Sequence, residues 1–206
     1  MNAGFWDERF RSEVFAYGRE PNGFLRDEAH RIPSGRVLCL AEGEGRNAVF
    51  LALCGYAVTA VDFSAEGLRK AQQLASEHGV AIDTLHADLA TYDLEQGAFS
   101  AVVAIFAHLP PAVRTRVHAQ VPGALAIGGV FILEAYTPSQ LAHGTGGPRD
   151  PAWLMTLDGL TKEFGSLEVQ VGREVEREIH EGAFHTGVGA TVQFVATRPS
   201  SRVPTS

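Results

Sequence analysis

From residue 36 onward, the chain alternates between short runs of almost wholly apolar residues and longer segments with helical spacing. The run 100–106 has no polar residue after its first, which is typical of a parallel strand covered on both faces. This alternation predicts an α/β fold with a doubly wound, mostly parallel sheet. The predicted strands are 37–41, 57–61, 81–86, 100–106 and 130–135, and the predicted helices between them are 46–54, 64–78 and 110–121.

The last third of the chain follows a different pattern. Residues 167–180 and 191–197 predict two long strands joined by the glycine-rich turn 181–189. They would form an antiparallel hairpin at one edge and bring the sheet to seven strands. Before them, residues 138–151 are rich in Gly, Pro and His without a clear period, and residues 156–164 predict a short helix.

The turn after the first strand is the most specific pattern in the chain. Apolar residues run into Glu42-Gly43-Glu44-Gly45, a helix opens at Arg46, and the next strand ends on Asp62. A strand, glycine turn, helix and strand with an acid at the second tip are typical of a nucleotide-cofactor site, in which the acid holds a ribose. The alternative is that the two glycines only let the helix pack closely on the strand.

The charges of this turn indicate the kind of cofactor. A pyrophosphate at a helix N-terminus requires bare amides and positive potential, and the carboxylates of Glu42 and Glu44 would repel it. A cofactor that has a ribose, no phosphate and a positive charge fits better. S-adenosylmethionine has these properties, so the turn favours a methyltransferase over a dehydrogenase.

Composition narrows the partners and the compartment. The 206 residues carry a net charge of −7 and have no cluster of Lys or Arg, which argues against a nucleic-acid or membrane partner. The polar, acidic N-terminus does not resemble a signal peptide, and the two cysteines, Cys39 and Cys54, do not suggest a disulfide framework. We expect a cytoplasmic monomer or homodimer that acts on a small molecule and holds no metal.

Several segments together resemble the class I S-adenosylmethionine-dependent methyltransferases, which have a Rossmann-like sheet with a reversed last strand. The first motif of that family has Cys39 here in place of its acid and Ala41 in place of its first glycine, while Asp62 and Asp88 match its second and third acids. Within the family, the run Gly45-Arg46-Asn47 is similar to the tellurite-resistance and thiopurine methyltransferases. The segments Trp6-Asp7-Glu8-Arg9-Phe10, Tyr17-Gly18 and Glu20-Pro21-Asn22 share this similarity.

The resemblance implies a role for matching positions in this chain. Asp62 would accept the ribose hydroxyls, and Asp88 would lie near the adenine amino group. The acceptor would be small and soft or oxyanionic, such as a thiol or a metalloid oxyanion. The residues expected at the cofactor are Tyr17, Glu42, Gly43, Gly45, Arg46, Asn47, Asp62, Phe63, Asp88, Leu89 and Phe106.

The chain is expected to form one domain with three parts. Residues 1–35 would be N-terminal lid helices, at 5–17 and 24–32, that carry Trp6 and Tyr17 over the cofactor. Residues 36–198 would be the S-adenosylmethionine-binding domain, and residues 199–206 a flexible tail. For the aromatic residues, the alternative is a helix that merely docks on the sheet.

Three residues are candidates for the catalytic machinery. His108 follows the fourth strand and is the best candidate for a base, although it could instead cap the helix that follows. Arg177 could hold an oxyanion, and His180 resembles a histidine placed at the active site in the tellurite-resistance group. In a strand Arg177 and His180 face opposite ways, so both cannot point inward without a bulge. A charged, solvated edge strand is the simpler interpretation of this segment, and a metal site from His180, Glu181 and His185 lacks a recognised spacing.

Two other functions compete with methyl transfer. A protein that binds S-adenosylmethionine without turnover remains open because of the replacements at Cys39 and Ala41. A nicotinamide-dependent oxidoreductase is disfavoured by the acidic turn and the reversed final strand.

Overall fold

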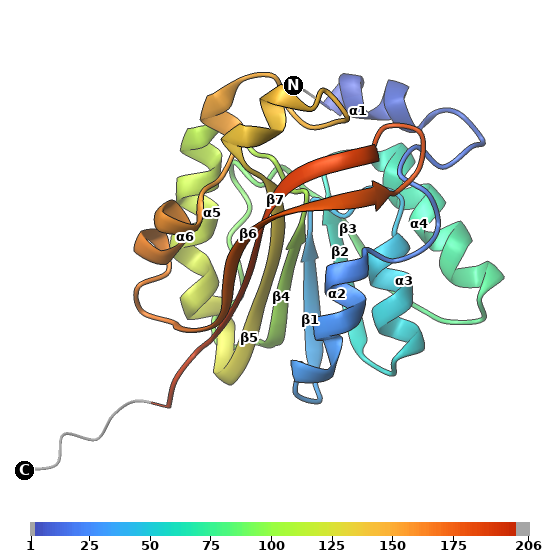
Figure 1. The fold of residues 1–206 in the computed structure, drawn as a ribbon. Helices are drawn as coiled ribbons and strands as arrows, with labels where there is room; N and C mark the ends of the chain where they lie inside the picture. The colour runs from blue at the N-terminus through green and yellow to red at the C-terminus, as the bar shows by residue number, and fades with distance from the viewer. Residues whose placement is uncertain (1–2, 201–206) are drawn as a thin grey trace, which may run out of the picture.

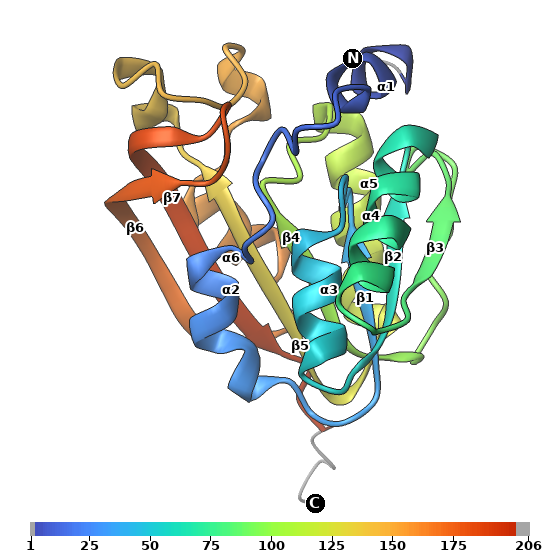
Figure 2. The ribbon, with the colours of Figure 1, turned by 90° about the vertical axis from the view of Figure 1, so that its right-hand side faces the viewer.

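The computed structural model describes residues 3–200, in which one seven-stranded sheet is flanked by helices (Figures 1 and 2). The strand order is β3-β2-β1-β4-β5-β7-β6, and the register pairs every neighbour in parallel except β5–β7 and β7–β6. The predicted fold class and the antiparallel terminal hairpin are therefore confirmed. The strands are β1 (Arg36–Leu40), β2 (Ala57–Asp62), β3 (Asp83–His86), β4 (Phe99–Ile105), β5 (Leu125–Tyr136), β6 (Glu168–His180) and β7 (Thr186–Thr197).

Helices cover both faces of the sheet, as the apolar strands require. Every residue of β4 is buried, which confirms the expectation of a central strand. One core cluster contains Leu38 and Phe131, and the other, on the opposite face, contains Val37 and Ile132. The α-helices are α1 (Ala3–Phe10), α2 (Gly23–Glu28), α3 (Arg46–Leu53), α4 (Ala65–Glu77), α5 (Pro111–Ala124) and α6 (Leu157–Glu163), and the 3₁₀ turns are Ala29–Arg31, Pro138–Ala142 and Pro151–Trp153.

The first helix is shorter than the pattern predicts, because tertiary contacts take its backbone groups. The predicted helix 5–17 ends at Phe10. The Lys70 ammonium donates to the carbonyls of Ser12 and Val14, and the Glu44 carboxylate accepts from the amide of Ala16. Bonds that would have formed within a helix are thus made to side chains of the sheet domain.

Three other boundaries differ from the sequence prediction. Helix α5 passes through Pro122 to Ala124, because a proline in the last turn removes only one helical hydrogen bond. Strand β5 begins at Leu125, before the predicted glycine turn, and Gly128 with φ 78° forms an irregularity within it. Strand β7 begins at Thr186, so the hairpin turn is only residues 181–185.

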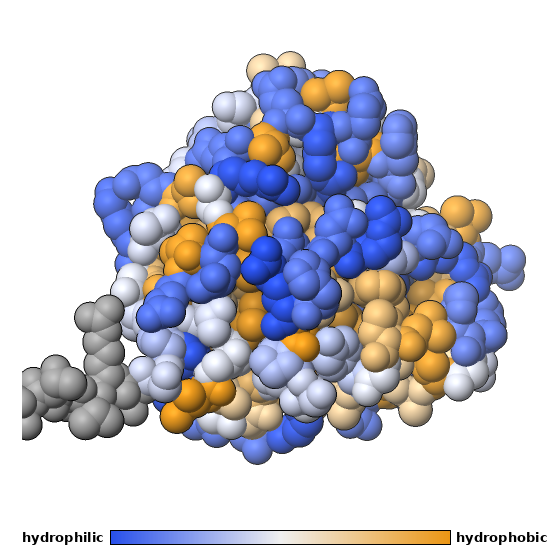
Figure 3. Space-filling model, turned by 60° about the horizontal axis from the view of Figure 1, so that its bottom comes forward, coloured by the Kyte–Doolittle hydropathy of each residue, from blue (hydrophilic) through white to orange (hydrophobic). Residues whose placement is uncertain are grey.

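The end of the molecule opposite the carboxyl ends of the parallel strands presents a mixed surface. Figure 3 shows a face on which apolar and polar side chains are interspersed. Exposed apolar residues such as Leu53 and Ile127 are normal when scattered. Cys39 is buried and Cys54 exposed, and both are free thiols. Within residues 3–200, no helix is long and apolar enough to cross a membrane. The predicted tail lies outside the described residues from position 201 onward.

Candidate functional site

The glycine turn lies at the carboxyl end of β1, where the strand order reverses between β1 and β4. Ala41, Gly43 and Gly45 all have left-handed backbone conformations, with φ of 50°, 61° and 87°. The Asp62 carboxylate at the tip of β2 accepts a 2.7 Å hydrogen bond from the Gly43 amide. A Cβ at Gly45 would lie 2.5 Å from the Ala71 Cβ, so this glycine is also required for packing between α3 and α4. The packing interpretation therefore holds for Gly45, and a role of the two glycines at the cofactor stays a prediction.

Glu42 places a half-buried carboxylate at the start of α3. Its Oε1 accepts from the amides of Asn47 and Ala48, at 3.0 and 2.8 Å, and caps the helix. The pKa of Glu42 is raised to about 7, chiefly by removal of the carboxylate from water and to a smaller extent by the Asp62 carboxylate, while the two hydrogen bonds and Arg46 oppose the rise. Two neighbouring acids at one turn favour a cationic ligand. The residues present therefore fit S-adenosylmethionine better than a pyrophosphate.

We expect the affinity for S-adenosylmethionine to rise with pH through Glu42. A carboxyl with its pKa at about 7 is protonated below that pH and ionised above it, and a nearby sulfonium stabilises the ionised form. Affinity for S-adenosylmethionine should rise by up to about tenfold between roughly pH 6 and 8. Without ligand, the same raised pKa should lower the free energy of unfolding as pH increases from 4.5 to about 7. Calorimetry should show a weaker rise for S-adenosylhomocysteine, which lacks the sulfonium. A rise that persists in Glu42→Gln would contradict the assignment.

The predicted cofactor residues at the ends of β2 and β3 differ from one another in their exposure to solvent. Asp62 is buried, and its second oxygen accepts from the Ser64 amide at 2.8 Å. Burial raises its pKa against these hydrogen bonds. Asp88 is exposed and accepts from the Ala90 amide, whereas Leu89 is buried in the core cluster of its face. Phe63 is half-buried.

Helix α1 covers the glycine turn. Phe10 is buried, and a Cβ at Gly43 would lie 3.2 Å from its ring. Trp6 stacks on Phe10 with ring centroids 5.7 Å apart. Asp7 accepts a hydrogen bond from the Ser64 hydroxyl at 2.5 Å, which joins α1 to the start of α4. The aromatic N-terminal segment thus packs directly over the predicted ribose and turn residues.

Glu44 has a structural role that the sequence analysis did not foresee. It is 4 % exposed and pairs with Lys70 at 2.5 Å, while its second oxygen accepts from the Ala16 amide at 2.8 Å and from the Tyr17 amide at 3.4 Å. Its charge is therefore neutralised by Lys70. Of the two acids in the turn, only Glu42 contributes to a site for a cation.

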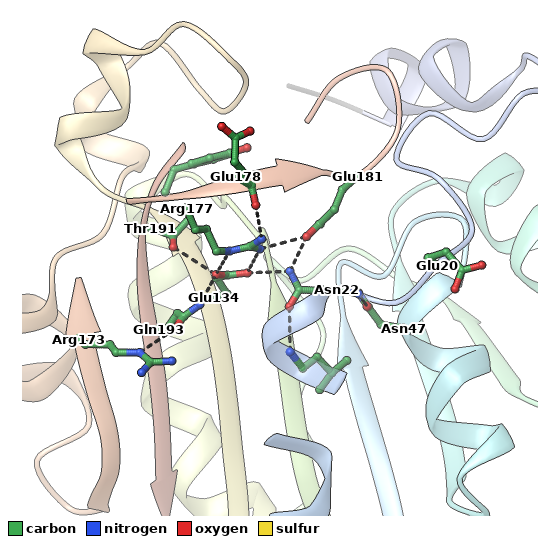
Figure 4. Close-up of polar contacts among 12 residues, drawn as sticks. Glu20, Asn22, Asn47, Glu134, Arg173, Arg177, Glu178, Glu181, Thr191 and Gln193 are labelled. Carbon is green, nitrogen blue, oxygen red and sulfur yellow. Dashed lines mark hydrogen bonds and ion pairs between the residues drawn. The ribbon is translucent and has the colours of Figure 1, made fainter. Parts of the chain in front are cut away.

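A buried network of charged groups connects β5, β6 and the N-terminal segment (Figure 4). Glu134 is fully buried and accepts two hydrogen bonds from Arg177, at 2.9 and 2.7 Å, and one from Asn22 at 2.7 Å. Gln193 and Thr191 donate to its Oε1 as well. Both carboxylate oxygens of Glu134 are therefore hydrogen-bonded, and Glu134 holds the β6–β7 hairpin to β5 and to the N-terminal segment.

The same network holds two residues that were expected at the cofactor. Arg46 donates to Glu181 at 2.5 Å, and Glu181 also accepts from Arg177 at 3.0 Å and from Asn22 at 2.9 Å. Asn47 accepts from the Asn22 amide at 2.9 Å. Arg46 and Asn47 therefore tie the start of α3 to the hairpin turn and the N-terminal segment. In the sequence analysis Asn22 appears only as part of a family-like segment and Glu181 only as a possible metal ligand, because only the fold brings the two residues together.

The geometry argues against two of the three catalytic candidates. Arg177 points inward and gives its charge to Glu134 and Glu181, so it has none to offer an oxyanion. The His180 side chain is 73 % exposed, and its Nε2 lies 3.8 Å from Glu178 Oε2. Both side chains are on the face of β6 opposite to that of Arg177. The period-two argument is thus confirmed for this strand. Among residues 3–200, no group of three or more His, Cys, Asp or Glu side chains could hold a metal ion.

His108 has a backbone partner at each ring nitrogen. The Tyr136 amide donates to Nε2 at 3.3 Å, so Nε2 is unprotonated, and Nδ1 carries the proton that it donates to the Trp153 carbonyl at 3.2 Å. Burial lowers the pKa of His108 to about 4. This geometry favours a role in positioning the end of β5. A general base at His108 stays a prediction that requires one of these bonds to break.

Aromatic rings gather at the carboxyl ends of β4 and β5. Phe106, with φ 51°, lies 4.7 Å from both Tyr136 and His185 by ring centroids. The Tyr17 ring lies 4.6 Å from His185 by centroids. The Tyr17 hydroxyl accepts a 3.2 Å hydrogen bond from the Arg9 guanidinium. This cluster contains Tyr17 and Phe106, two of the residues expected at the cofactor. His185 was considered only as a metal ligand, since its place in the turn conceals its contact with β4.

Comparisons with known proteins agree with this geometry. Residues 37–129 match the family model of a methyltransferase domain, while no curated protein matches the chain. A structure from work on the conversion of a disulfide bond into a thioacetal group during echinomycin biosynthesis is 19% identical with a TM-score of 0.76, over 98% of this chain and 94% of its own. TehB from Haemophilus influenzae is 18% identical with a TM-score of 0.72, over 96% and 67%. An S-adenosylmethionine-dependent methyltransferase from Clostridium acetobutylicum is 14% identical with a TM-score of 0.64, over 96% and 98%.

At such identities, the solved structures show a shared fold. The matched residues 37–129 run from β1 into β5 and include the glycine turn, Asp62 and Phe106. Over this range the chain therefore matches a methyltransferase domain, and the residues of its turn fit S-adenosylmethionine as the cofactor.

Proposed function

We propose that this protein transfers a methyl group from S-adenosylmethionine to a small, soft acceptor, either a thiol or a metalloid oxyanion. The observation that carries the proposal is the match of residues 37–129 to a methyltransferase domain whose turn presents Glu42 and Asp62 as neighbouring acids. S-adenosylmethionine supplies a methyl group on a positively charged sulfur that leaves as a neutral thioether. The protein has to orient the acceptor in line with that methyl and exclude water.

A soft acceptor is consistent with the groups around the site. Both ring nitrogens of His108 are bonded to backbone groups, and the charge of Arg177 is taken up by carboxylates. A thiol or a tellurite-like oxyanion needs little help from a base, since a few per cent, roughly, of an ordinary thiol is already thiolate at neutral pH. The acceptor's electron pair would form the new bond to carbon, and any proton on the acceptor would leave to solvent.

We infer that a lid is formed by the first part of the N-terminal segment. Phe10 and Trp6 pack over the glycine turn, so ligand entry requires α1 to move. The second predicted lid helix has a different environment, because Phe24 and Leu25 of α2 are buried in a core cluster of the sheet. The lid in this proposal therefore ends before α2.

The rival functions are weaker for structural reasons. The departures at Cys39 and Ala41 leave the turn intact, because Cys39 is fully buried in β1 and Ala41 adopts the left-handed conformation that a glycine would take. A binding protein without turnover is therefore not favoured by these replacements. The neighbouring acids of the turn disfavour a nicotinamide cofactor. A metalloid acceptor is supported by the resemblance of Gly45-Arg46-Asn47 to the tellurite-resistance methyltransferases, and a thiol by the pairing of Arg46 and Arg177 with carboxylates.

The proposal is tested by assaying release of S-adenosylhomocysteine. The purified protein would be incubated with S-adenosylmethionine and a panel of small thiols, selenols, selenite and tellurite. We expect release that depends on at least one acceptor. Tight binding of S-adenosylmethionine without release across the panel would favour the non-catalytic alternative, and binding of NAD in its place would contradict the proposal.

A further inference from the structure

Two buried polar atoms near the aromatic cluster have no hydrogen-bond partner. Tyr136 is 0 % exposed and His185 is 8 % exposed, and the Tyr136 hydroxyl and His185 Nδ1 are both unpaired. A third such atom among the described residues, Arg114 Nε, belongs to a guanidinium that donates to backbone carbonyls through Nη1. Leaving a buried polar group unpaired is costly, so two neighbouring cases require an explanation.

The two unpaired atoms lie within one group of packed rings, formed by Tyr17, Phe106, Tyr136 and His185, which we call the enclosure. The Tyr136 and His185 rings are 5.3 Å apart by centroids and nearly perpendicular, at 85°. Phe106 and Tyr17 form further walls around His185. A Cβ at Gly146 would lie 3.0 Å from the Tyr136 hydroxyl and 3.1 Å from His185 Cδ2, so a glycine with φ 145° brings bare backbone against both. Apolar ring faces with two polar atoms are typical of a ligand site.

Two of the three arginines near the enclosure are paired with carboxylates. Arg46 and Arg177 are bonded to Glu181 and Glu134, so neither offers free positive charge. Arg9 lies beyond the Tyr17 ring, with its guanidinium 4.0 Å from the centroid of the Phe184 ring. Burial, together with these arginines and His108, lowers the pKa of His185 to about 3, so its imidazole is neutral at physiological pH.

We propose that Tyr136 and His185 bind the methyl acceptor, and that they select an uncharged acceptor whose nucleophilic atom carries a proton, namely a thiol. This inference rests on the proposed methyl transfer and narrows its acceptor class. The acceptor's S–H would donate to His185 Nδ1, and the Tyr136 hydroxyl would donate to the sulfur. Binding would thereby satisfy both unpaired atoms at once. As the sulfur electron pair forms the bond to the methyl carbon, the bond from that carbon to the sulfonium breaks, and the thiol proton would pass by way of His185 to solvent.

The same geometry disfavours an oxyanion. An oxyanion in the enclosure would lose its hydration and would carry no proton to donate to His185 Nδ1, which in the proposed tautomer only accepts a hydrogen bond. Specificity of this kind comes from polar groups that only the correct ligand pairs. A thiol with an apolar body would also bury that body against Phe106 and Tyr17.

The first test removes only the Tyr136 hydroxyl. Tyr136→Phe should leave the Tm unchanged or higher, because it deletes an unpaired group, and should lower kcat/KM for benzenemethanethiol by about tenfold or more. The matched control is Tyr56→Phe, at the opposite end of the sheet. The Tyr56 hydroxyl donates to the carbonyls of Ile32 and Ala29, so this change should lower the Tm and leave kcat/KM unaltered.

The second test concerns His185. His185→Gln should also lower kcat/KM for the thiol. The matched control is His118→Gln, which removes a buried histidine of α5 that pairs with Glu163 and should leave kcat/KM unchanged. In the wild-type protein with S-adenosylhomocysteine bound, adding benzenemethanethiol should shift the imidazole NMR signals of His185, and adding tellurite should not.

The outcomes separate this inference from the proposed function. Absence of turnover with every acceptor would overturn the proposed function, and the NMR titration would still decide the binding pair. Unchanged kcat/KM in both variants, or saturating thiol that leaves the His185 signals unmoved, would overturn the pair alone. Faster turnover with tellurite than with any thiol would overturn the acceptor class.

Discussion

Replacing Asp62 with Ala is expected to weaken S-adenosylmethionine binding by about 2–3 kcal/mol, which is about 30- to 140-fold in affinity. The Asp62 carboxylate ends β2 beside the glycine turn, is buried, and would accept two charge-assisted hydrogen bonds from the ribose. It also accepts from the amides of Gly43 and Ser64, so the variant loses support for the turn as well. Calorimetry at a temperature where the variant is folded measures the effect.

A control separates ligand binding from loss of charge. Asp83→Ala removes an exposed acid at the start of β3, away from the carboxyl ends of the strands, and should leave affinity near wild type. An Asp62→Ala protein that is folded by circular dichroism and binds S-adenosylmethionine as tightly as wild type would remove Asp62 from the cofactor site.

Replacing Glu134 with Gln is expected to destabilise the fold by about 3–5 kcal/mol. Glu134 is 0 % exposed and accepts five hydrogen bonds, two of them from Arg177. The amide of Gln brings donors against the guanidinium and leaves its charge buried without its main partner. Chemical denaturation monitored by circular dichroism measures the loss.

Two further variants show whether the loss arises from the buried pair. Arg177→Met in the Glu134→Gln background should restore part of the stability, because the uncompensated charge is then gone. Asp158→Asn, which breaks the exposed pair with Lys162, should cost less than about 0.5 kcal/mol. Equal losses for Glu134→Gln and Asp158→Asn would contradict the role assigned to the network.

The sheet could be predicted from the sequence because its strands carry their own signals. The apolar run that became β4 and the acid that ends β2 are local features, and burial on both faces leaves little choice for such segments. The reversed hairpin followed from two long alternating segments near the C-terminus. Only its turn was placed too long, since the glycines at 187 and 189 lie within β7.

The site was less predictable because its contacts join distant parts of the chain. Asn22 reaches Glu134 and Glu181, which lie 112 and 159 residues away. The Glu44–Lys70 pair that ends the first helix early is likewise long-range. No local sequence pattern shows that the charge of a side chain will be neutralised by a partner far away in the chain. Arg177 therefore looked available for an oxyanion when considered within its own strand.

Each of the two departures from the family motif, at Cys39 and at Ala41, has its own physical explanation. Cys39 lies in β1 with no exposure and belongs to a core cluster, where an unpaired acid would be costly. Glu42, three residues later, supplies the acid of the turn instead. Ala41 keeps the left-handed conformation of the glycine it replaces, at about 1–2 kcal/mol of strain that the surrounding packing has to offset.

Transfer of a labelled methyl group tests the central claim most directly. The protein would be incubated with S-adenosylmethionine carrying ¹³C in its methyl group, together with benzenemethanethiol, and the products followed by NMR. We predict that the label appears on the sulfur of the thiol in step with formation of S-adenosylhomocysteine, and that it does so more slowly in Tyr136→Phe. Label that stays on bound S-adenosylmethionine with every thiol and metalloid acceptor tried would contradict methyl transfer by this protein.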